Sequence, residues 1–341
     1  SFQAAAINVE ELYDQFSYGI NKHPFAIRNY LKFAIDNYQD TIKALFLIGK
    51  PYKAGQGNLN YRKNASIYEN TLVPSLGNPP SDILFTAGIV DTLYQPAIPT
   101  GRLAARTPTD VSLYLDKMQL YEAAQNAPYN PNNPMEKEWM KNILHFAGGS
   151  TYAQMLGLKS YLDAYKMILE DTLFGGYVRT FKKYSTVPIQ QNQTDSIKNL
   201  INNGVSILNF FGHAAGVGFD ISIENPSVYS NYGKYPFLFA NSCLAGDLFQ
   251  SVPSSSEAFV LIAGKGTIGY LGSVTQSVDT YLHLYSHRLM KNLGQRMYGK
   301  GIGEIIKQTI ADLQTPNDYV KEICLEMTLH GDPMLKINPF D

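Results

Sequence analysis

Two apolar stretches, VSILNFFGH (residues 205–213) and YPFLFANSC (residues 235–243), decide the fold and raise the main question about function. Each is a short run of strand-forming residues without polar alternation, which is typical of a parallel strand buried on both faces. Each run then breaks into a turn that carries a reactive side chain, His213 in the first and Cys243 in the second. Cys243 is therefore either a small core residue or a nucleophile at the end of a strand.

Segments with helical periodicity alternate with apolar runs along the rest of the chain. Strands that alternate with helices predict right-handed βαβ units, and hence an α/β fold with mainly parallel sheets flanked by helices. No internal repeat is visible. The further expected strands cover residues 43–49, the end of 136–149, and 265–273, and the expected helices cover residues 8–16, 23–39, 110–125, 161–174, 194–204, 254–264, 279–294 and 301–314.

Turn-forming residues predict the boundaries of several elements. Asn8 is suited to cap the first helix, Thr109 or Asp110 to cap the helix at 110–125, and Gly204 to end the helix that precedes it. NAPYNPNNP (residues 126–134) is dense in Asn and Pro and is typical of a connector. We therefore expect two subdomains, residues 1–130 and residues 131–341.

The charge and hydrophobicity of the sequence disfavour two kinds of partner, nucleic acids and a membrane that the chain would span. The net charge is −1 and no long basic cluster occurs, which disfavours nucleic-acid binding. No apolar run reaches the roughly 20 residues that a membrane span needs. The first residues carry no signal-peptide pattern, and two cysteines, Cys243 and Cys324, cannot form a disulfide framework.

If the two opening strands are parallel neighbours, their carboxyl ends lie about 5 Å apart, where open α/β sheets bind ligands. His213 and Cys243 would then face one crevice. A histidine can help to form a thiolate and can protonate a departing amine, while the N–H groups of Cys243 and Ala214 can stabilise an oxyanion. A cysteine or a histidine near a strand end is commonly just a packed core residue, so the local pattern leaves both interpretations open.

The blocks NFFGHAAGVGFD (residues 209–220) and FLFANSCLAGDLF (residues 237–249) resemble those of the gingipain family in the caspase-like clan of cysteine peptidases. The opening helices, the segment IPTGRLAARTPTDVSLYLDKMQLYE (residues 98–122) and LHGDPMLKI (residues 329–337) agree in order and spacing. The resemblance covers nearly the whole chain.

The resemblance implies a caspase-like subdomain preceded by a smaller α/β subdomain, with His213 as general acid and Cys243 as nucleophile. It places Gln276, Ser277 and Val278 at the wall of the pocket for the residue before the cut. It implies a protein or peptide substrate, a bacterial extracellular or cell-surface location, and flanking domains of a larger chain. The chemistry needs no cofactor, and relatives often carry structural calcium.

Several positions depart from the family pattern. Ala214 replaces a usual glycine and disfavours positive φ, which the oxyanion turn can require. Ala147-Gly148-Gly149 offers no acid to orient the histidine, Lys50 stands where relatives commonly have Asp, and GGSTYAQMLGLK (residues 148–159) lacks the acid that suits a basic substrate residue. The alternative hypothesis is a pseudopeptidase, a weak or inactive domain that serves as a protein-binding or structural module.

Three other sequence patterns give only weak indications of a functional site. GKGTIG (residues 264–269) matches a dinucleotide fingerprint, but the expected order is helix before and strand after, the reverse of that motif. His283 and His287 share a helical face without the H-E-x-x-H form, so packing is the expected role. Cys324 sits among helical apolar residues and is expected in the core.

Overall fold

The structure, a computed structural model, describes residues 4–38, 42–54, 60–90, 94–128, 130–171, 173–187, 194–215, 218–221, 223 and 225–339. The end of the helix expected at 23–39 therefore lies outside the described residues at Gln39.

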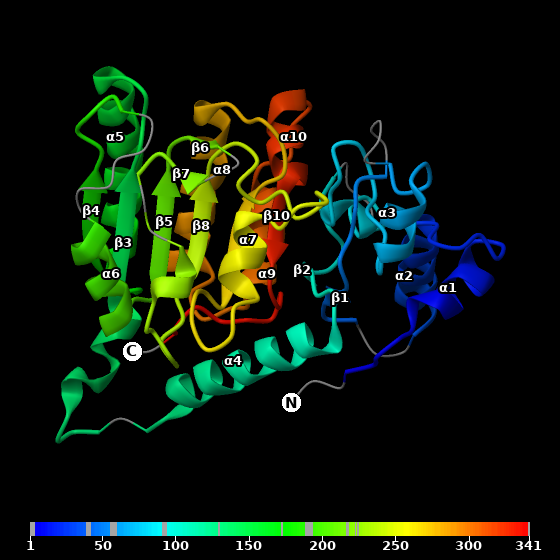
Figure 1. The fold of residues 1–341 in the computed structure, drawn as a ribbon, viewed down its shortest axis with the longest axis horizontal. Helices are drawn as coiled ribbons and strands as arrows, with labels where there is room; N and C mark the ends of the chain where they lie inside the picture. Colours follow the sequence, from blue (N-terminus) through cyan, green and yellow to red (C-terminus); the bar gives the residue numbers. More distant parts are fainter. Residues whose placement is uncertain are drawn as a thin grey trace.

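One eight-stranded sheet runs through the described part of the chain, in the order β1-β2-β10-β9-β8-β5-β3-β4 (Figure 1). All neighbours pair in parallel except β10 and β9, which are antiparallel. This arrangement confirms the predicted mainly parallel α/β fold. The strands are β1 (Leu45–Ile48), β2 (Thr100–Leu103), β3 (Asn142–Ala147), β4 (Tyr177–Lys182), β5 (Ile207–Phe211), β8 (Phe237–Asn241), β9 (Gly269–Ser273) and β10 (Met327–His330), and a separate hairpin pairs β6 (Ala214–Ala215) with β7 (Gly218–Phe219).

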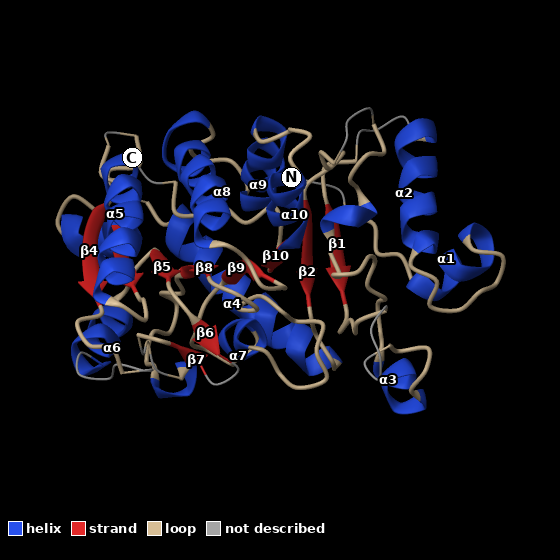
Figure 2. Cartoon of the chain, turned by 90° about the horizontal axis from the view of Figure 1, so that it is seen from above, coloured by secondary structure: helices blue, strands red, loops and turns tan. Residues whose placement is uncertain are grey.

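Helices cover both faces of the sheet, as Figure 2 shows with α5, α8, α9 and α10 on one side and α4, α6 and α7 on the other. The α-helices are α1 (Val9–Phe16), α2 (Phe25–Asn37), α3 (Ala65–Asn70), α4 (Pro108–Asn126), α5 (Tyr152–Leu169), α6 (Thr194–Asn203), α7 (Ser255–Val260), α8 (Asp279–Lys291), α9 (Ile302–Asp312) and α10 (Asp318–Glu326). Short turns of other helix types are η2 (Ile83–Phe85), η3 (Pro134–Lys141), η4 (Pro226–Val228) and the π-type η5 (Asn292–Arg296).

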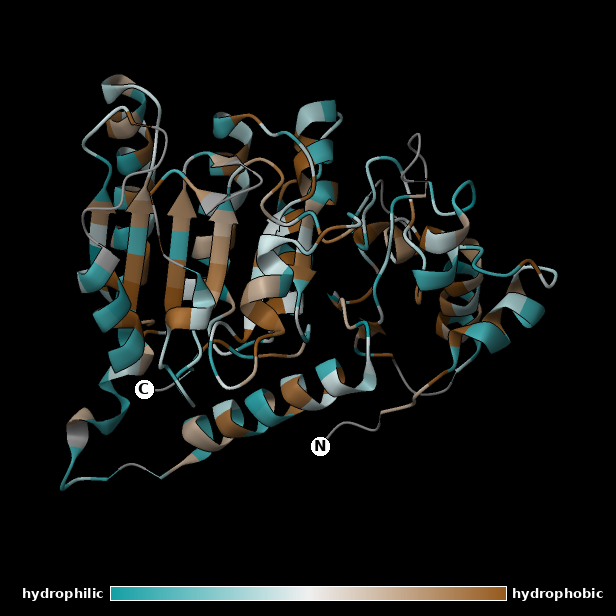
Figure 3. Cartoon of the chain, in the orientation of Figure 1, coloured by the Kyte–Doolittle hydropathy of each residue, from teal (hydrophilic) through white to brown (hydrophobic). Residues whose placement is uncertain are grey.

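The central strands are the apolar ones that the sequence indicates. Every position of β5, β8 and β9 is buried, and the hydropathy colouring is brown along much of β3, β5 and β8 (Figure 3). β1, the strand expected within residues 43–49, is less buried than these central strands. It is an edge strand, and Ile48 at its end is 47% exposed.

The cap of α4 also differs from its prediction. Thr107, rather than Thr109 or Asp110, caps the helix: its side chain accepts the N–H of Asp110, and the Asp110 carboxylate accepts the N–H of Thr107. Pro108 occupies the first helical position, where a missing N–H costs nothing. The predicted cap of α1 by Asn8 is confirmed.

α4 lies under the sheet and contacts the second half of the chain. The Tyr114 hydroxyl donates to the carbonyl oxygen of Ile268 at 3.1 Å, and Lys117 donates to those of Val260 and Thr267 at 3.0 and 2.8 Å. The sheet likewise continues from β2 to β10. The division into residues 1–130 and 131–341 stays a prediction.

Candidate active site

The two opening strands are parallel neighbours, as predicted. β5 pairs with β8 in register from Ile207↔Phe237 to Phe211↔Asn241. The N–H of Gly212 donates to the carbonyl oxygen of Asn241 at 3.3 Å, so the pairing continues into the turns. His213 and Cys243 each follow this last pair by two residues, on adjacent turns at the same edge of the sheet.

The turn that carries Cys243 is tightly held. Leu244 adopts a positive φ of 56°, which is rare for a leucine and is found mainly where the surroundings impose it. Its N–H donates to Thr275 O at 2.9 Å, and the N–H of Gly246 donates to Ser273 O at 2.8 Å. A Cβ on Gly246 would lie 2.2 Å from Gly272 O, so this close approach needs glycine. The backbone thus fixes where Cys243 points.

The thiol of Cys243 lies against the predicted substrate wall. The N–H of Ser277 donates to Cys243 Sγ at 3.4 Å, and Ser277 O lies 3.5 Å from the same sulfur. Gln276 is exposed, and Val278 is 56% exposed beside them. The structure therefore brings the wall segment to the candidate nucleophile.

A buried carboxyl group supports this wall from behind. Ser277 Oγ donates to Glu326 Oε1 at 2.5 Å and lies 2.8 Å from Ser273 Oγ. Glu326 is 3% exposed, and burial raises the pKa of its carboxyl to about 7, against the lowering effect of the Ser277 hydrogen bond. Its other oxygen, Oε2, has no partner among the described residues.

The turn after β5 forms the β6–β7 hairpin. Asp220 N–H donates to His213 O at 2.9 Å, which makes these two residues a hydrogen-bonded pair of the antiparallel ladder. Bonded and non-bonded pairs alternate in such a ladder, so the next pair, Ala214 with Phe219, is non-bonded and the N–H of Ala214 points away from β7. Ala214 is extended, so the turn does not need the positive φ that alanine disfavours.

Asp220 holds this hairpin against the turn after β3. Its Oδ2 accepts the N–H of Gly149 at 2.7 Å and lies 3.6 Å from Lys183 Nζ. A Cβ on Gly148 or Gly212 would lie 2.0 or 2.6 Å from Asp220 Oδ1. The two glycines therefore leave room for this carboxylate, which faces the Gly148–Gly149 turn in place of the acid that the resemblance expects there.

Among the described residues, Gln154 lies within hydrogen-bond distance of the His213 ring, and the sequence analysis missed it. Gln154 Oε1 lies 3.0 Å from His213 Nε2 and accepts the N–H of Ser150 at 2.8 Å, while Gln154 Nε2 donates to Asp279 Oδ2 at 3.1 Å. A signal was present: Thr151-x-x-Gln154 fits the capping-box pattern, which places Gln154 in the first turn of a helix directly after β3.

Comparison with known proteins identifies the family. The profile of Peptidase family C25 matches residues 1–338. The chain belongs to peptidase family C25. It is 25% identical over 205 residues to Lys-gingipain HG66 of Porphyromonas gingivalis, a match that covers 58% of this chain and 11% of that relative. The predicted resemblance to gingipain-like cysteine peptidases is confirmed.

Solved structures share the fold of this C25 chain. The Arg-specific cysteine proteinase gingipain R matches with a TM-score of 0.71 and 17% identity over 95% of this chain and 70% of that chain. The complex of the Porphyromonas gingivalis RgpB pro- and mature domains matches with a TM-score of 0.71 and 16% identity, over 95% and 72%. The chain spans about a tenth of the curated relative, so its activity is argued below from its own residues.

The first part of this C25 chain supports the loop after Cys243. Lys50 Nζ donates to Leu248 O at 2.7 Å and to Glu257 Oε2 at 2.8 Å. Lys53 pairs with Asp247 at 2.8 Å. Lys50 is thus a buried side chain that binds the carbonyl oxygen of Leu248, in the loop after Cys243, and the Glu257 carboxylate of α7.

The remaining candidate residues of the sequence lie outside the site. Cys324 is fully buried in α10, and burial raises the pKa of its thiol to about 12. His283 stacks on Tyr161 with ring centroids 3.8 Å apart, which is a packing role as predicted. GKGTIG follows α7 and ends on Gly269, the first residue of β9, and a Cβ on Gly266 would lie 2.2 Å from the carbonyl oxygen of Phe259, so the turn between them needs glycine at position 266.

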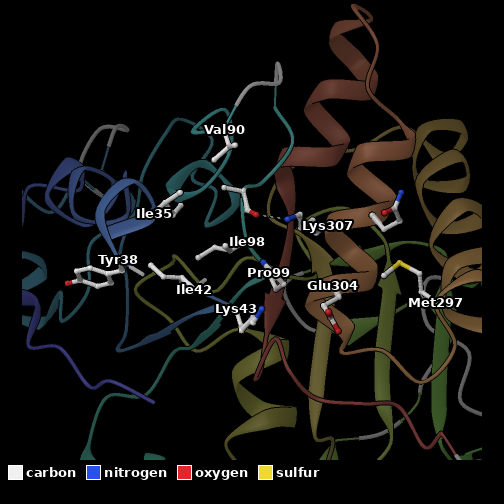
Figure 4. A pocket seen from close by; sticks show the side chains of 12 residues that line it. Ile35, Tyr38, Ile42, Lys43, Val90, Ile98, Pro99, Met297, Glu304 and Lys307 are labelled. Atoms are coloured by element: carbon white, nitrogen blue, oxygen red, sulfur yellow. Dashed lines mark hydrogen bonds between the residues drawn. The ribbon is translucent and has the colours of Figure 1, made fainter. Parts of the chain in front are cut away.

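A cavity of about 500 Å³ lies away from the strand-end turns (Figure 4). Side chains of α2 and of the segment before β1 face Met297, which directly follows η5, and side chains of α9 across it, and Lys307 donates to the carbonyl oxygen of Ala97 within it. None of its lining residues belongs to the candidate site. The cavity is therefore separate from the strand-end turns that carry His213 and Cys243.

Neither a metal-binding cluster nor a membrane-spanning helix is found among the residues that the structure describes. No three or more His, Cys, Asp or Glu side chains gather there as a metal site. No helix in that part of the chain combines the length and apolarity that a membrane span requires.

Proposed function

We propose that the chain is the catalytic domain of a cysteine endopeptidase, with Cys243 as nucleophile and His213 as general acid and base. The observation that carries the proposal is the register of β5 and β8, which ends both strands at one level and sets the two side chains on adjacent turns. The contact of Cys243 Sγ with Ser277 adds a substrate wall at the same place.

The reaction follows from these positions. His213 takes the proton of the Cys243 thiol, the sulfur attacks the scissile carbonyl carbon to form a C–S bond, and the carbonyl π-electron pair moves to oxygen. The N–H groups of Ala214 and Cys243 donate to this oxyanion. The C–N bond breaks as His213 protonates the departing amine and leaves a thioester. Water then attacks the thioester carbon as His213 takes its proton; the C–S bond breaks, the carboxylic acid is released, and the proton on His213 returns to the sulfur of Cys243.

The substrate is a protein or peptide, with Gln276, Ser277 and Val278 beside the residue before the cut. We propose an extracellular or cell-surface bacterial location, flanking domains of a larger chain, and no nucleic-acid partner. The chemistry uses no cofactor. Structural calcium stays an expectation drawn from the family, and no step depends on it.

A second candidate function is a pseudopeptidase that binds protein without cutting it. One observation favours it: the group against His213 Nε2 is the neutral amide of Gln154 rather than a carboxylate.

A panel of peptidyl acyloxymethyl ketones that differ in the residue before the cut tests both functions. We expect one adduct per chain on Cys243, located by mass spectrometry, and its loss in Cys243→Ala and His213→Ala. Cys324 is the internal control, since its buried thiol stays unlabelled. A folded protein without any adduct under reducing conditions, with and without calcium, would favour the pseudopeptidase.

A further inference from the structure

The contacts of Gln154 determine which way its amide points. A backbone N–H can only donate, so the Ser150 N–H at 2.8 Å identifies its partner as the carbonyl oxygen Oε1. A carboxylate only accepts, so Asp279 Oδ2 at 3.1 Å identifies its partner as the amide nitrogen Nε2. Two unambiguous neighbours therefore fix an orientation that an isolated glutamine leaves open.

This orientation determines the tautomer of His213. Gln154 Oε1 is an acceptor, so the imidazole nitrogen 3.0 Å from it must carry the proton. In a neutral imidazole one nitrogen donates and the other accepts, so a proton on Nε2 leaves the lone pair on Nδ1. Nδ1 is then the nitrogen that exchanges protons with the thiol and the leaving amine.

We propose that Gln154 is a positioning residue that holds His213 in the Nε2–H tautomer, with Asp279 anchoring the amide. The proposal rests on the proposed function in assigning proton transfer to His213. Asp279 is the first residue of α8 and directly follows Val278 of the substrate wall. The chain Asp279–Gln154–His213 therefore also links the orientation of the histidine to the position of the wall.

The Gln154 amide fulfils part of the role that a carboxylate at this position would have beside His213. It selects the tautomer and the ring orientation, but it carries no charge to stabilise the imidazolium that forms during the reaction. The carboxylate of this chain sits one hydrogen bond further out, on Asp279. Exchanging the amide and the carboxylate between the two positions keeps each hydrogen bond, with donor and acceptor reversed between residues 154 and 279, and keeps the net charge.

The first test removes the acceptor with Gln154→Met, a side chain of similar length. We expect ¹⁵N spectra of the histidines to show His213 as the Nε2–H tautomer in the unaltered protein and as a mixture in the variant, with His213→Gln assigning the signal. We expect kcat to fall roughly 100-fold with KM nearly unchanged. Gln119→Met is the matched control, because Gln119 is exposed on α4.

The second test is the double exchange of Gln154→Glu with Asp279→Asn. Gln154→Glu alone would set two carboxylates side by side, whereas in the double variant the new amide at position 279 can donate to the new carboxylate at position 154. We expect the Nε2–H tautomer to be kept and kcat to reach at least the level of the unaltered protein.

Three outcomes separate the hypotheses. A His213 in the Nδ1–H form, or a tautomer unchanged by Gln154→Met, overturns the positioning role. A double variant that keeps the tautomer but not kcat overturns its catalytic consequence. In the third outcome, neither the unaltered protein nor any variant cuts peptides, but the His213 tautomer still responds to Gln154→Met as expected. The proposed function then fails, and the assignment of Gln154 stands.

Discussion

Two regions of the same sheet are stabilised in different ways. The central strands β5 and β8 are buried and mostly apolar, and they end at the candidate site. The edge region around β1 and β2 is built on buried charge: Arg102 is fully buried and donates to both oxygens of Asp82 at 2.8 and 2.7 Å. The difference teaches that continuous apolar strands position the candidate site residues, whereas a buried ion pair stabilises the edge region of the same sheet.

Breaking the charge of the edge region should have the largest effect on stability. Arg102→Met leaves Asp82 as a buried carboxylate without its partner, so we expect the free energy of unfolding to fall by about 3–5 kcal/mol. Urea unfolding followed by the fluorescence of the single tryptophan, Trp139, measures it. Lys159→Met breaks the half-exposed pair with Asp163 and should cost under about 1 kcal/mol; equal losses would contradict the comparison.

The strand that joins the two regions, β10, follows directly on Glu326. Burial raises the pKa of this carboxyl to about 7 in the folded protein, against 4.5 without the fold. The folded state therefore binds the proton more tightly, so this group's contribution to stability is fully present below about pH 4.5 and is lost as the pH rises to about 7.

Glu326→Gln removes this pH dependence, because an amide stays neutral. Between pH 5 and pH 8 we expect the unaltered protein to lose about 1–3 kcal/mol relative to the variant. Urea midpoints at both pH values measure the difference, with exposed Glu138→Gln as the control. Parallel pH profiles of the two proteins would rule the effect out.

A stability loss of similar size, together with a direct effect on the site, is expected from Gly246→Ala. The added Cβ would lie 2.2 Å from Gly272 O, so the loop after Cys243 must shift. We expect a cost of about 1–3 kcal/mol and a loss of roughly 100-fold in kcat/KM. Gly157→Ala in α5 meets nothing within 4 Å and should instead stabilise the protein slightly. Full activity in Gly246→Ala would show that the turn need not be tight.

The central strands were predictable because a strand that is buried on both faces needs apolar residues at consecutive positions, which the sequence shows as a continuous apolar run. The neighbouring positions of His213 and Cys243 followed from the same pattern. The edge position of β1 was not predictable, since its residues are as apolar as those of a central strand. The partner of Lys50 lies 207 residues away at Glu257, and such distant pairs leave no local pattern. For Gln154, the sequence could have predicted a place in the first turn of a helix but not its contact with His213.

α4 crosses the predicted boundary between residues 1–130 and 131–341 in space. The helix belongs by sequence to residues 1–130, yet its 19 residues extend about 28 Å beneath the strands of the other part, and Tyr121 donates to the carbonyl oxygen of Lys336 near the end of the described chain. If the backbone were cut in the connector after α4, the contacts of α4 would therefore hold the two pieces together. Nicking there, or producing the two pieces separately, offers a route to a split protein that reassembles.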